Sequence, residues 1–488
     1  MTDRRLRPQG GVRAFARATA LYAVATFIPR VGLFLLLPIY ARILLPEELG
    51  AFSLVISLAG LLAIAFRLGL DATLLRFHFD LKHDLGRLYA TTMAMALVAI
   101  ALGVVVAGIA LVPAFSALSA GLPYVPFALL ALAIGAGTAL QFVPFAWFRA
   151  VERPGRFLAY TAGSFAVTAT ISVALVVGLR SGAVGALVGQ LATALITALV
   201  AALIVARLSR LRLDRTLARK ELRFSLPLVP HAMAAWVLNV SDRWLLALLL
   251  PSGAAAARAE IGVYWVGYQI GYAIALLATS LQAAWLPIVY RQADPSHGGR
   301  IVGAMLLVTA GVLSALAVAL AAIGPEVVSL IAGDGYTDAA PVLAIVAAAS
   351  ILYGLYAVAV PVLLHERRTT TMAAATLGAG LVNVAINIAF IPILGIIGSA
   401  LATLVANAAY ATVTIWLVQH QWPLRASWRR LVPLVATAVT LLLGSAWLGA
   451  VLDLWARVAM ATVFGLVSLW AGRPCLPLLE REAAHRQA

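Results

Sequence analysis

The stretch Ala25-Thr26-Phe27-Ile28-Pro29-Arg30-Val31-Gly32, which continues through residues 33–37 to Pro38-Ile39-Tyr40-Ala41-Arg42, is apolar over a length that can cross a lipid bilayer. One arginine, Arg30, lies near its middle. A charged side chain at that depth costs about 3 kcal/mol, so it needs a partner or a function. The segment 226–250 repeats this arrangement, with Asp242 and Arg243 at a similar depth. Both stretches therefore indicate membrane spans that carry functional polar residues.

The composition extends this interpretation to the whole chain. Of its 488 residues, 63% are hydrophobic and only 11% are charged, which is typical of a polytopic helical membrane protein. The apolar segments are about 20 residues long, whereas barrel strands would be about 10. We predict an all-α integral membrane protein with about fourteen transmembrane helices. They cover residues 18–40, 49–66, 89–112, 124–147, 158–179, 183–206, 226–250, 261–283, 301–323, 340–364, 371–392, 396–418, 431–449 and 455–472.

The net charge of +16 follows the predicted topology. If the helices alternate in direction, 29 of the 35 lysines and arginines lie on the side of the two termini and four lie on the opposite side. This asymmetry matches the positive-inside rule, so we expect both termini in the cytoplasm, a location in the cell inner (plasma) membrane, and no nucleic-acid partner. The most basic connection, 207–223, is expected to lie against anionic lipid heads, with a cytoplasmic partner as the alternative.

An internal repeat divides the chain. Arg30 and Arg243 are 213 positions apart, and three further pairs occur at offsets of 212 to 214. The further pairs are Glu48-Leu49-Gly50 with Glu260-Ile261-Gly262, Glu152-Arg153 with Glu366-Arg367, and Gly182-Ala183-Val184-Gly185 with Gly395-Ile396-Ile397-Gly398. We therefore predict an N-terminal six-helix lobe (1–210), a C-terminal six-helix lobe (211–424) related to it by an axis along the membrane normal, and two additional helices with a cytoplasmic tail (425–488).

Chemical catalysis has no candidate site. The only lysines, Lys82 and Lys220, do not belong to a phosphate-binding loop. His365-Glu366 begins a zinc-protease pattern, but Thr369 stands where the second histidine belongs. The single cysteine, Cys475, excludes disulfides within the chain. We expect no enzymatic activity, no catalytic or metal-binding residue and no cofactor.

Polar residues inside the predicted spans are the candidates for substrate binding. Arg30, Arg243 and Asp242 come first, because one aspartate cannot neutralise two arginines and the two lobes would then enclose a positive cavity. A guanidinium group suits phosphate oxygens, so a diphosphate is a natural ligand. The alternative is that Arg30 bonds to carbonyls freed by Pro29, or forms an ion pair with Asp242.

Further candidates lie near the span ends and in the other spans. Arg67, Asp71, Arg76 and Arg149 would guide an anionic head group from the cytoplasmic face, although snorkelling to the interface also explains them. His231, Gln141, Asn239, Asn383 and Asn387 would bond to sugar hydroxyls, although hydrogen bonds between helices also explain these residues.

Several segments resemble one family. They are Pro38-Ile39-Tyr40-Ala41-Arg42-Ile43-Leu44-Leu45-Pro46-Glu47-Glu48-Leu49-Gly50, Phe148-Arg149-Ala150-Val151-Glu152-Arg153, Ser225-Leu226-Pro227-Leu228-Val229-Pro230, Asp242-Arg243 and Ile261-Gly262-Val263-Tyr264. In their order along the chain they are similar to the bacterial polysaccharide-export flippases of the multidrug/oligosaccharidyl-lipid/polysaccharide exporter superfamily. The resemblance implies two six-helix lobes in a V, with alternating access to a central cavity. The last two helices resemble those of lipid II flippases, where such a pair helps to form a groove for the lipid tail.

The resemblance also implies a substrate, an undecaprenyl-diphosphate-linked oligosaccharide moved from the cytoplasmic to the outer leaflet. The implied partners are this lipid, the bilayer and the machinery of a polysaccharide polymerase or ligase. Two alternatives remain. A multidrug cation antiporter of the same superfamily would need several carboxylates deep in its lobes, and a membrane glycosyltransferase, polymerase or ligase would need a sizeable external loop. The sequence shows one deep carboxylate, Asp242, and short external connections only.

Overall fold

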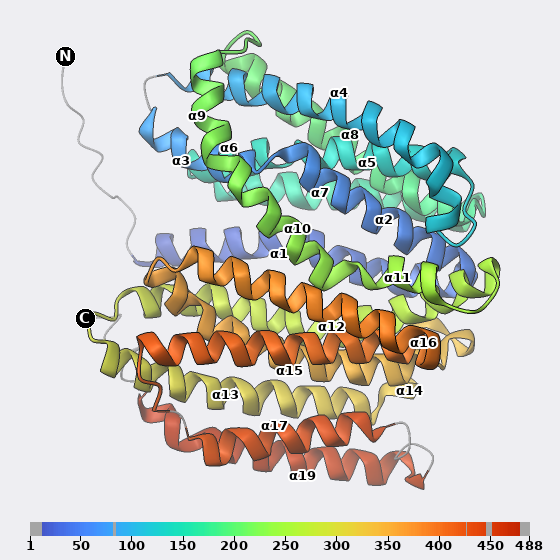
Figure 1. The fold of residues 1–488 in the computed structure, drawn as a ribbon, viewed down its shortest axis with the longest axis vertical. Coiled ribbons are helices and arrows are strands. Elements are labelled where there is room, and N and C mark those ends of the chain that lie inside the picture. The colour runs from blue at the N-terminus through green and yellow to red at the C-terminus, as the bar shows by residue number, and fades with distance from the viewer. Residues whose placement is uncertain (1–11, 82–83, 426, 446–450, 479–488) are drawn as a thin grey trace. The chain divides into compact units, whose positions relative to one another are not determined.

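The computed structural model describes residues 12–81, 84–425, 427–445 and 451–478, and for residues 12–20, 22–23, 26 and 29–30 it describes the backbone only. These described parts of the chain are helical and contain no strand (Figure 1). The predicted all-α class is therefore confirmed.

The helices follow one another with short connections. In order they are α1 (Val12–Ile43), α2 (Pro46–Arg67), α3 (Leu70–Asp80), α4 (Leu85–Leu118), η1 (Tyr124–Ala128), α5 (Leu129–Ala139), α6 (Phe142–Ala150), α7 (Pro154–Val173), η2 (Ala174–Gly178), α8 (Gly182–Leu208), α9 (Arg215–Ser225), η3 (Leu226–Leu228), α10 (Val229–Val240), α11 (Asp242–Leu249), α12 (Ala254–Tyr290), α13 (Pro295–Ala322), α14 (Gly324–Ala332), η4 (Asp334–Tyr336), α15 (Ala339–His365), α16 (Thr369–Gln421), α17 (Trp428–Leu443), α19 (Leu454–Gly472) and η5 (Arg473–Cys475).

Ten helices in the described residues are long and apolar enough to span a membrane, and an eleventh span is possible where Arg215–Val240 and Asp242–Leu249 meet at a bend of 58°. The protein is therefore a multi-pass membrane protein. Helix α16 has 53 residues and contains Gly395 in a non-helical conformation (φ 55°, ψ −132°). At 1.5 Å per residue a straight helix of that length would exceed twice the hydrocarbon thickness, so α16 fits the two predicted spans 371–392 and 396–418. The total of fourteen stays a prediction.

The chain forms two compact units. Unit 1 comprises residues Met1–Ile43, Val55–Ser116 and Leu122–Ala232, and unit 2 comprises Leu44–Leu54, Ala117–Gly121 and Met233–Ala488. The predicted division at residues 210 and 424 stays a prediction, because compact units and sequence repeats need not share their boundaries.

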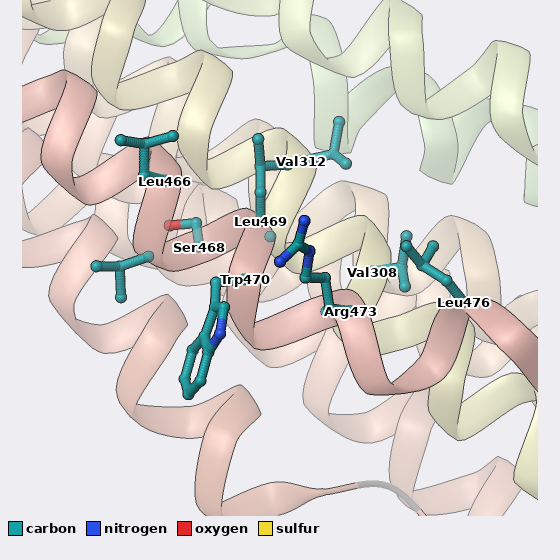
Figure 2. Close-up of a pocket in the computed structure, with 11 residues that line it drawn as sticks. Val308, Val312, Leu466, Ser468, Leu469, Trp470, Arg473 and Leu476 are labelled. Atoms are coloured by element: carbon teal, nitrogen blue, oxygen red, sulfur yellow. The ribbon is translucent and has the colours of Figure 1, made fainter.

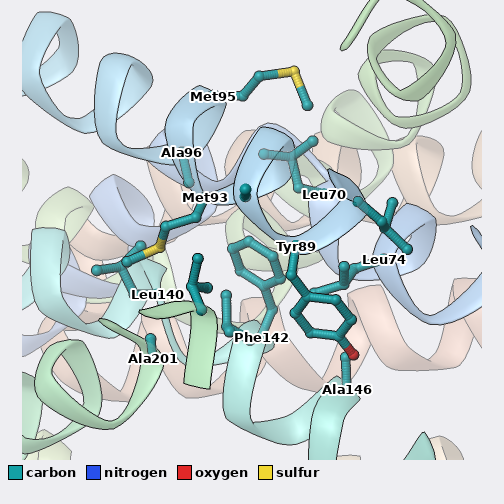
Figure 3. Close-up of a cluster of buried hydrophobic side chains, with 14 of the residues drawn as sticks. Leu70, Leu74, Tyr89, Met93, Met95, Ala96, Leu140, Phe142, Ala146 and Ala201 are labelled. Atoms are coloured by element: carbon teal, nitrogen blue, oxygen red, sulfur yellow. The ribbon is translucent and has the colours of Figure 1, made fainter. Parts of the chain in front are cut away.

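A cluster of buried hydrophobic side chains lies within unit 1. Figure 3 shows side chains from α3, α4, α6 and α8 that meet there, and α9 adds Leu217 and Ala218. On α9 the buried positions 217, 218, 221 and 225 recur at helical spacing, while Arg215, Arg219, Lys220 and Arg223 are exposed. Helix α9 is therefore an amphipathic helix docked on this cluster.

Helix α15 is the centre of unit 2. It contacts α12, α13 and α16, and its apolar residues are buried along most of its length. Helices α17 and α19 pack on α13, and Figure 1 shows these helices running side by side. The two C-terminal helices are thus an integral part of unit 2.

Candidate functional site

Arg67 is held at the end of α2 by a tight turn. Leu68 and Gly69 both have positive φ (51° and 69°), and a Cβ at Gly69 would lie 2.5 Å from the carbonyl oxygen of Ser225. This turn starts α3 one residue later, so that Asp71 returns to within 3.8 Å of the Arg67 guanidinium. The ion pair is long, and the Arg67 Nε is buried without a hydrogen-bond partner among the described residues. Arg67 therefore keeps unused capacity for an anion.

Arg149 lies beside Arg67. Both arginines line a cavity of about 210 Å³ in unit 1, together with Asp71, Gln141 and Phe145. Arg149 is exposed near the end of α6, and its guanidinium lies over the rings of Phe145 (5.9 Å) and Phe157 (5.7 Å). With two arginines and one aspartate, the lining carries a formal excess of positive charge. We refer to this cavity as the arginine pocket.

Gln141 connects the arginine pocket to a second cavity. The turn between α5 and α6 places Gln141 in the lining of both cavities. The second cavity, of about 140 Å³, has polar groups from α7 and α8, so we call it the hydroxyl pocket. Besides Gln141, its polar lining consists of Tyr160, Thr161, Ser164, Thr168, Gln190, Thr193 and Thr197.

Hydrogen bonds within the hydroxyl pocket fix its shape. The Tyr160 and Thr197 hydroxyls lie 2.9 Å apart, and Thr193 Oγ1 donates to the Ser164 carbonyl oxygen at 3.1 Å. The Ser164 Oγ is buried without a partner among the described residues. Apart from Gln141, the sequence analysis did not identify this lining. The signal was present as a polar face at helical spacing, with Tyr160, Ser164 and Thr168 on α7.

Arg243 occupies a different environment, in unit 2. It is 5% exposed and pairs with the neighbouring Asp242, whose Oδ1 lies 3.0 Å from Arg243 Nη1. The Tyr264 hydroxyl donates to the other carboxylate oxygen, and the guanidinium lies 4.6 Å from the centre of the Tyr268 ring. Asp242 therefore neutralises Arg243, and the buried pair is formed between adjacent residues. Arg30 lies in α1, but its side chain is outside the described residues.

The remaining predicted residues lie apart from the two pockets. Arg76 is exposed and stacks on Phe224 at 4.8 Å. The Asn239 amide donates to the Ala235 carbonyl oxygen at 2.7 Å. Asn387 donates to the Asn383 side-chain oxygen at 3.0 Å within α16. The Nδ1 of His231 is buried and has no partner in the described part of the chain. The structure thus brings together Arg67, Asp71, Gln141 and Arg149 from the predicted set.

A larger cavity than these two, mainly apolar, lies in unit 2. It has a volume of about 670 Å³ and is lined by residues of α13, α19 and the turn that follows α19. Figure 2 shows Val308, Val312, Leu466 and Leu469 around it, with Arg473 beside them. Its lining suits a hydrocarbon chain.

No group of three or more histidine, cysteine or acidic residues that could hold a metal ion occurs in the described residues.

Comparison with known proteins agrees with this architecture. The model of the family described as "Polysaccharide biosynthesis protein" matches residues 15–292. Among solved structures, the lipid II flippase MurJ in an inward closed conformation is 13% identical, with a TM-score of 0.69 over 92% of this chain and 98% of that chain. An inward-facing multidrug resistance MATE family transporter of the MOP superfamily is 17% identical, with a TM-score of 0.61 over 82% and 94%. A Vibrio cholerae MATE transporter is 15% identical, with a TM-score of 0.52 over 83% and 95%. No curated protein sequence matches.

Proposed function

This chain belongs to the polysaccharide biosynthesis protein family, and on that premise we propose that it is a flippase for an undecaprenyl-diphosphate-linked oligosaccharide. The predicted resemblance to this family and its superfamily is confirmed. In the proposal, the substrate enters from the cytoplasmic leaflet of the inner membrane and leaves to the outer leaflet by alternating access. Both termini lie in the cytoplasm, and the product passes to a polysaccharide polymerase or ligase.

One observation carries the proposal, namely that the arginine pocket and the hydroxyl pocket share Gln141. A diphosphate matches the guanidinium groups of Arg67 and Arg149, because paired N–H donors bind phosphate oxygens well. The first sugar, which is covalently attached to the diphosphate, has many hydroxyls and matches the polar lining from α7 and α8. The two halves of the substrate head group therefore find complementary chemistry in adjoining spaces.

Unit 2 has its own apolar cavity between α13 and α19, whose mainly aliphatic lining suits a hydrocarbon chain. The resemblance of the C-terminal helix pair to that of the lipid II flippases points to the same kind of ligand for this cavity. Outward movement of a negatively charged head group is favoured by an inside-negative membrane potential, by about 2.3 kcal/mol per charge per 100 mV. The membrane potential is therefore one driving force that needs no ATP, and proton or sodium coupling is the alternative.

The competing proposal is a multidrug cation antiporter, which the similar fold of the MATE transporters permits. The positive lining of the arginine pocket disfavours a cationic substrate. Expression of the protein in a drug-sensitive host distinguishes the two: resistance to cationic dyes would favour the antiporter, and unchanged sensitivity is expected for a flippase.

The functional test is export of polysaccharide in a strain that lacks this gene. Arg67→Ala and Arg149→Ala should each reduce surface polysaccharide strongly at equal protein abundance, because each removes charge-assisted hydrogen bonds worth about 1.5–3 kcal/mol. Arg67→Lys and Arg149→Lys should restore part of it, since they keep the charge but lose the planar guanidinium. Arg76→Ala is the matched control, because Arg76 lies on Phe224 and not in the pocket. Normal export by both alanine variants would refute the assignment of the head-group site.

A further inference from the structure

A carboxyl group is buried beneath the basic helix α9. Glu221 is 0% exposed, in contrast to the four exposed cationic side chains of the same helix. It lies on the buried face with Leu217, Ala218 and Ser225, which is the face that docks on the cluster in Figure 3. Glutamate is rarely buried completely without a cationic partner. No ion pair to Glu221 occurs in the described residues, so its charge state requires an explanation.

The hydrogen-bond geometry shows where a proton belongs. The Thr92 hydroxyl of α4 lies 2.8 Å from Glu221 Oε2 and 2.9 Å from the carbonyl oxygen of Leu88. A threonine hydroxyl has one hydrogen, and a carbonyl oxygen only accepts. Both bonds can form at once only when Thr92 donates to Leu88 and a protonated Glu221 carboxyl donates to Thr92. The neutral acid therefore satisfies both contacts, whereas an ionised carboxylate would take the Thr92 hydrogen and leave the contact to Leu88 without one.

The second carboxyl oxygen supports the same conclusion. Glu221 Oε1 is buried and has no hydrogen-bond partner among the described residues. An ionised carboxylate would leave that oxygen charged, desolvated and unpaired, which is far more costly than an unpaired oxygen of a neutral acid.

Other titratable groups on the neighbouring helices do not compensate a negative charge. His78 on α3 bonds to the Tyr89 hydroxyl on α4 at 3.0 Å, and Arg87 on α4 bonds to Asp214 at 2.7 Å. The remaining charged groups on the helices around α9 are Asp71, Arg76 and Asp80 on α3, Arg149 on α6 and Arg207 on α8, all of which are exposed.

We propose that Glu221 is a proton-binding site that is filled while α9 is docked on α4 and that releases its proton to water when α9 separates. The solvated carboxyl would have the ordinary glutamate pKa of about 4.3, so at neutral pH the undocked helix does not hold the proton. The docked state therefore binds one more proton than the undocked state. By linkage, docking is favoured at low pH and weakens as the pH rises.

The position of α9 makes this proton relevant to the arginine pocket. Ser225, one turn after Glu221, places its carbonyl oxygen against Gly69, in the turn that holds Arg67. Release of α9 would therefore loosen that turn. This consequence rests on the proposed function of the arginine pocket, whereas the proton-binding site itself does not.

The test is hydrogen–deuterium exchange of the α9 backbone in the purified full-length protein, without substrate, between about pH 6 and pH 9 and corrected for the intrinsic exchange rate. Protection of wild-type α9 should fall with rising pH by up to about tenfold per pH unit, the limit for one linked proton. Glu221→Gln, which imitates the neutral acid, should keep α9 protected throughout the range. Glu152→Gln is the matched control, because Glu152 is an exposed glutamate in the turn after α6 and should behave as wild type.

Asp214 does not interfere with this measurement. The backbone N–H of Leu217 and the Arg87 guanidinium hold the pKa of the Asp214 carboxyl below its usual value, so it stays ionised over this range.

Infrared spectroscopy adds a direct readout, since the protonated-carboxyl band at neutral pH should be lost in Glu221→Gln and kept in Glu152→Gln. Wild-type protection that does not change with pH, or an unchanged infrared band in Glu221→Gln, would overturn the proton site. Either result would leave the export test of Arg67 and Arg149 unaffected.

Discussion

The pair of Asp242 and Arg243 shows how one backbone feature decides the role of a charged residue in the membrane. Adjacent residues of a regular helix do not face each other. Here the chain bends by 58° between α10 and α11, and the Asp242 carboxylate accepts hydrogen bonds from both the backbone N–H and the side chain of Arg243. The bend therefore turns two sequence neighbours into a buried ion pair, and Arg243 has no excess charge to offer a substrate in this conformation.

Asp242→Ala should destabilise the protein, because it leaves the Arg243 guanidinium buried and uncompensated. Breaking a buried pair costs about 3–5 kcal/mol. The double variant Asp242→Ala/Arg243→Ala should lose less stability than the sum of the two single variants. The apparent melting temperature of the detergent-purified variants measures this coupling. Strictly additive losses would show that the two residues act independently.

The sequence singles out individual candidate residues more readily than it shows how they are arranged. Arg67, Gln141 and Arg149 are recognisable because each interrupts or ends an apolar segment. They meet through the ends of three helices, and spacing along the chain does not reveal that proximity. The threonines of α7 and α8 are common in apolar helices and carry no charge, so their shared face was not recognised as a site. The Asp242–Arg243 pair depends on a bend that hydrophobicity does not indicate.

At the scale of elements, a close contact between two helices gives a physical reason for one of the repeat matches, the one that contains Gly50 and Gly262. In unit 2, α2 and α12 cross near their first turns. A Cβ at Gly50 would lie 1.9 Å from the Arg258 carbonyl oxygen, and a Cβ at Gly262 would lie 2.0 Å from the Pro46 carbonyl oxygen. Arg258 also donates to the Ala120 carbonyl oxygen at 2.6 Å and lies 3.6 Å from the Glu47 carboxylate. Gly50 and Gly262, at matched positions of the predicted repeats, thus lie at one close crossing.

Gly50→Ala and Gly262→Ala should each separate this crossing. Backbone oxygen atoms cannot move away as a flexible side chain does, so we expect a loss of about 1–3 kcal/mol, the usual cost of overpacking. The apparent melting temperature in detergent measures it. Gly163→Ala on α7 is the matched control, since nothing lies within 4 Å of its added Cβ. That variant should be neutral or more stable by up to about 1 kcal/mol, from helix propensity. Equal behaviour of the three variants would contradict the close crossing.

At the scale of the whole molecule, the fold class could be predicted because the bilayer restricts which structures can span it. A helix that crosses hydrocarbon must be long and apolar, and the sequence displays both properties directly. The number and orientation of the spans depend instead on counting the segments correctly. Helix α16 shows the difficulty, because two predicted spans form one helix interrupted at Gly395.

Cysteine mapping tests the predicted orientation. Cys475 is the only cysteine, so Cys475→Ser provides a background without thiols. In intact cells, Ala255→Cys should react with a membrane-impermeant maleimide, because this exposed position lies between the seventh and eighth predicted spans, on the external side. Arg215→Cys, in the basic connection, should react only after the cells are opened. The reverse labelling pattern would invert the topology.

The central claim is that Arg67 and Arg149 bind the diphosphate of a lipid-linked sugar, and direct binding to the purified protein tests it most closely. We predict that an undecaprenyl-diphosphate-linked oligosaccharide binds more tightly than undecaprenyl monophosphate. Arg67→Ala and Arg149→Ala should each weaken its binding by about tenfold or more, while Arg76→Ala leaves the affinity unchanged. Equal affinity for the wild type and both pocket variants would contradict the account.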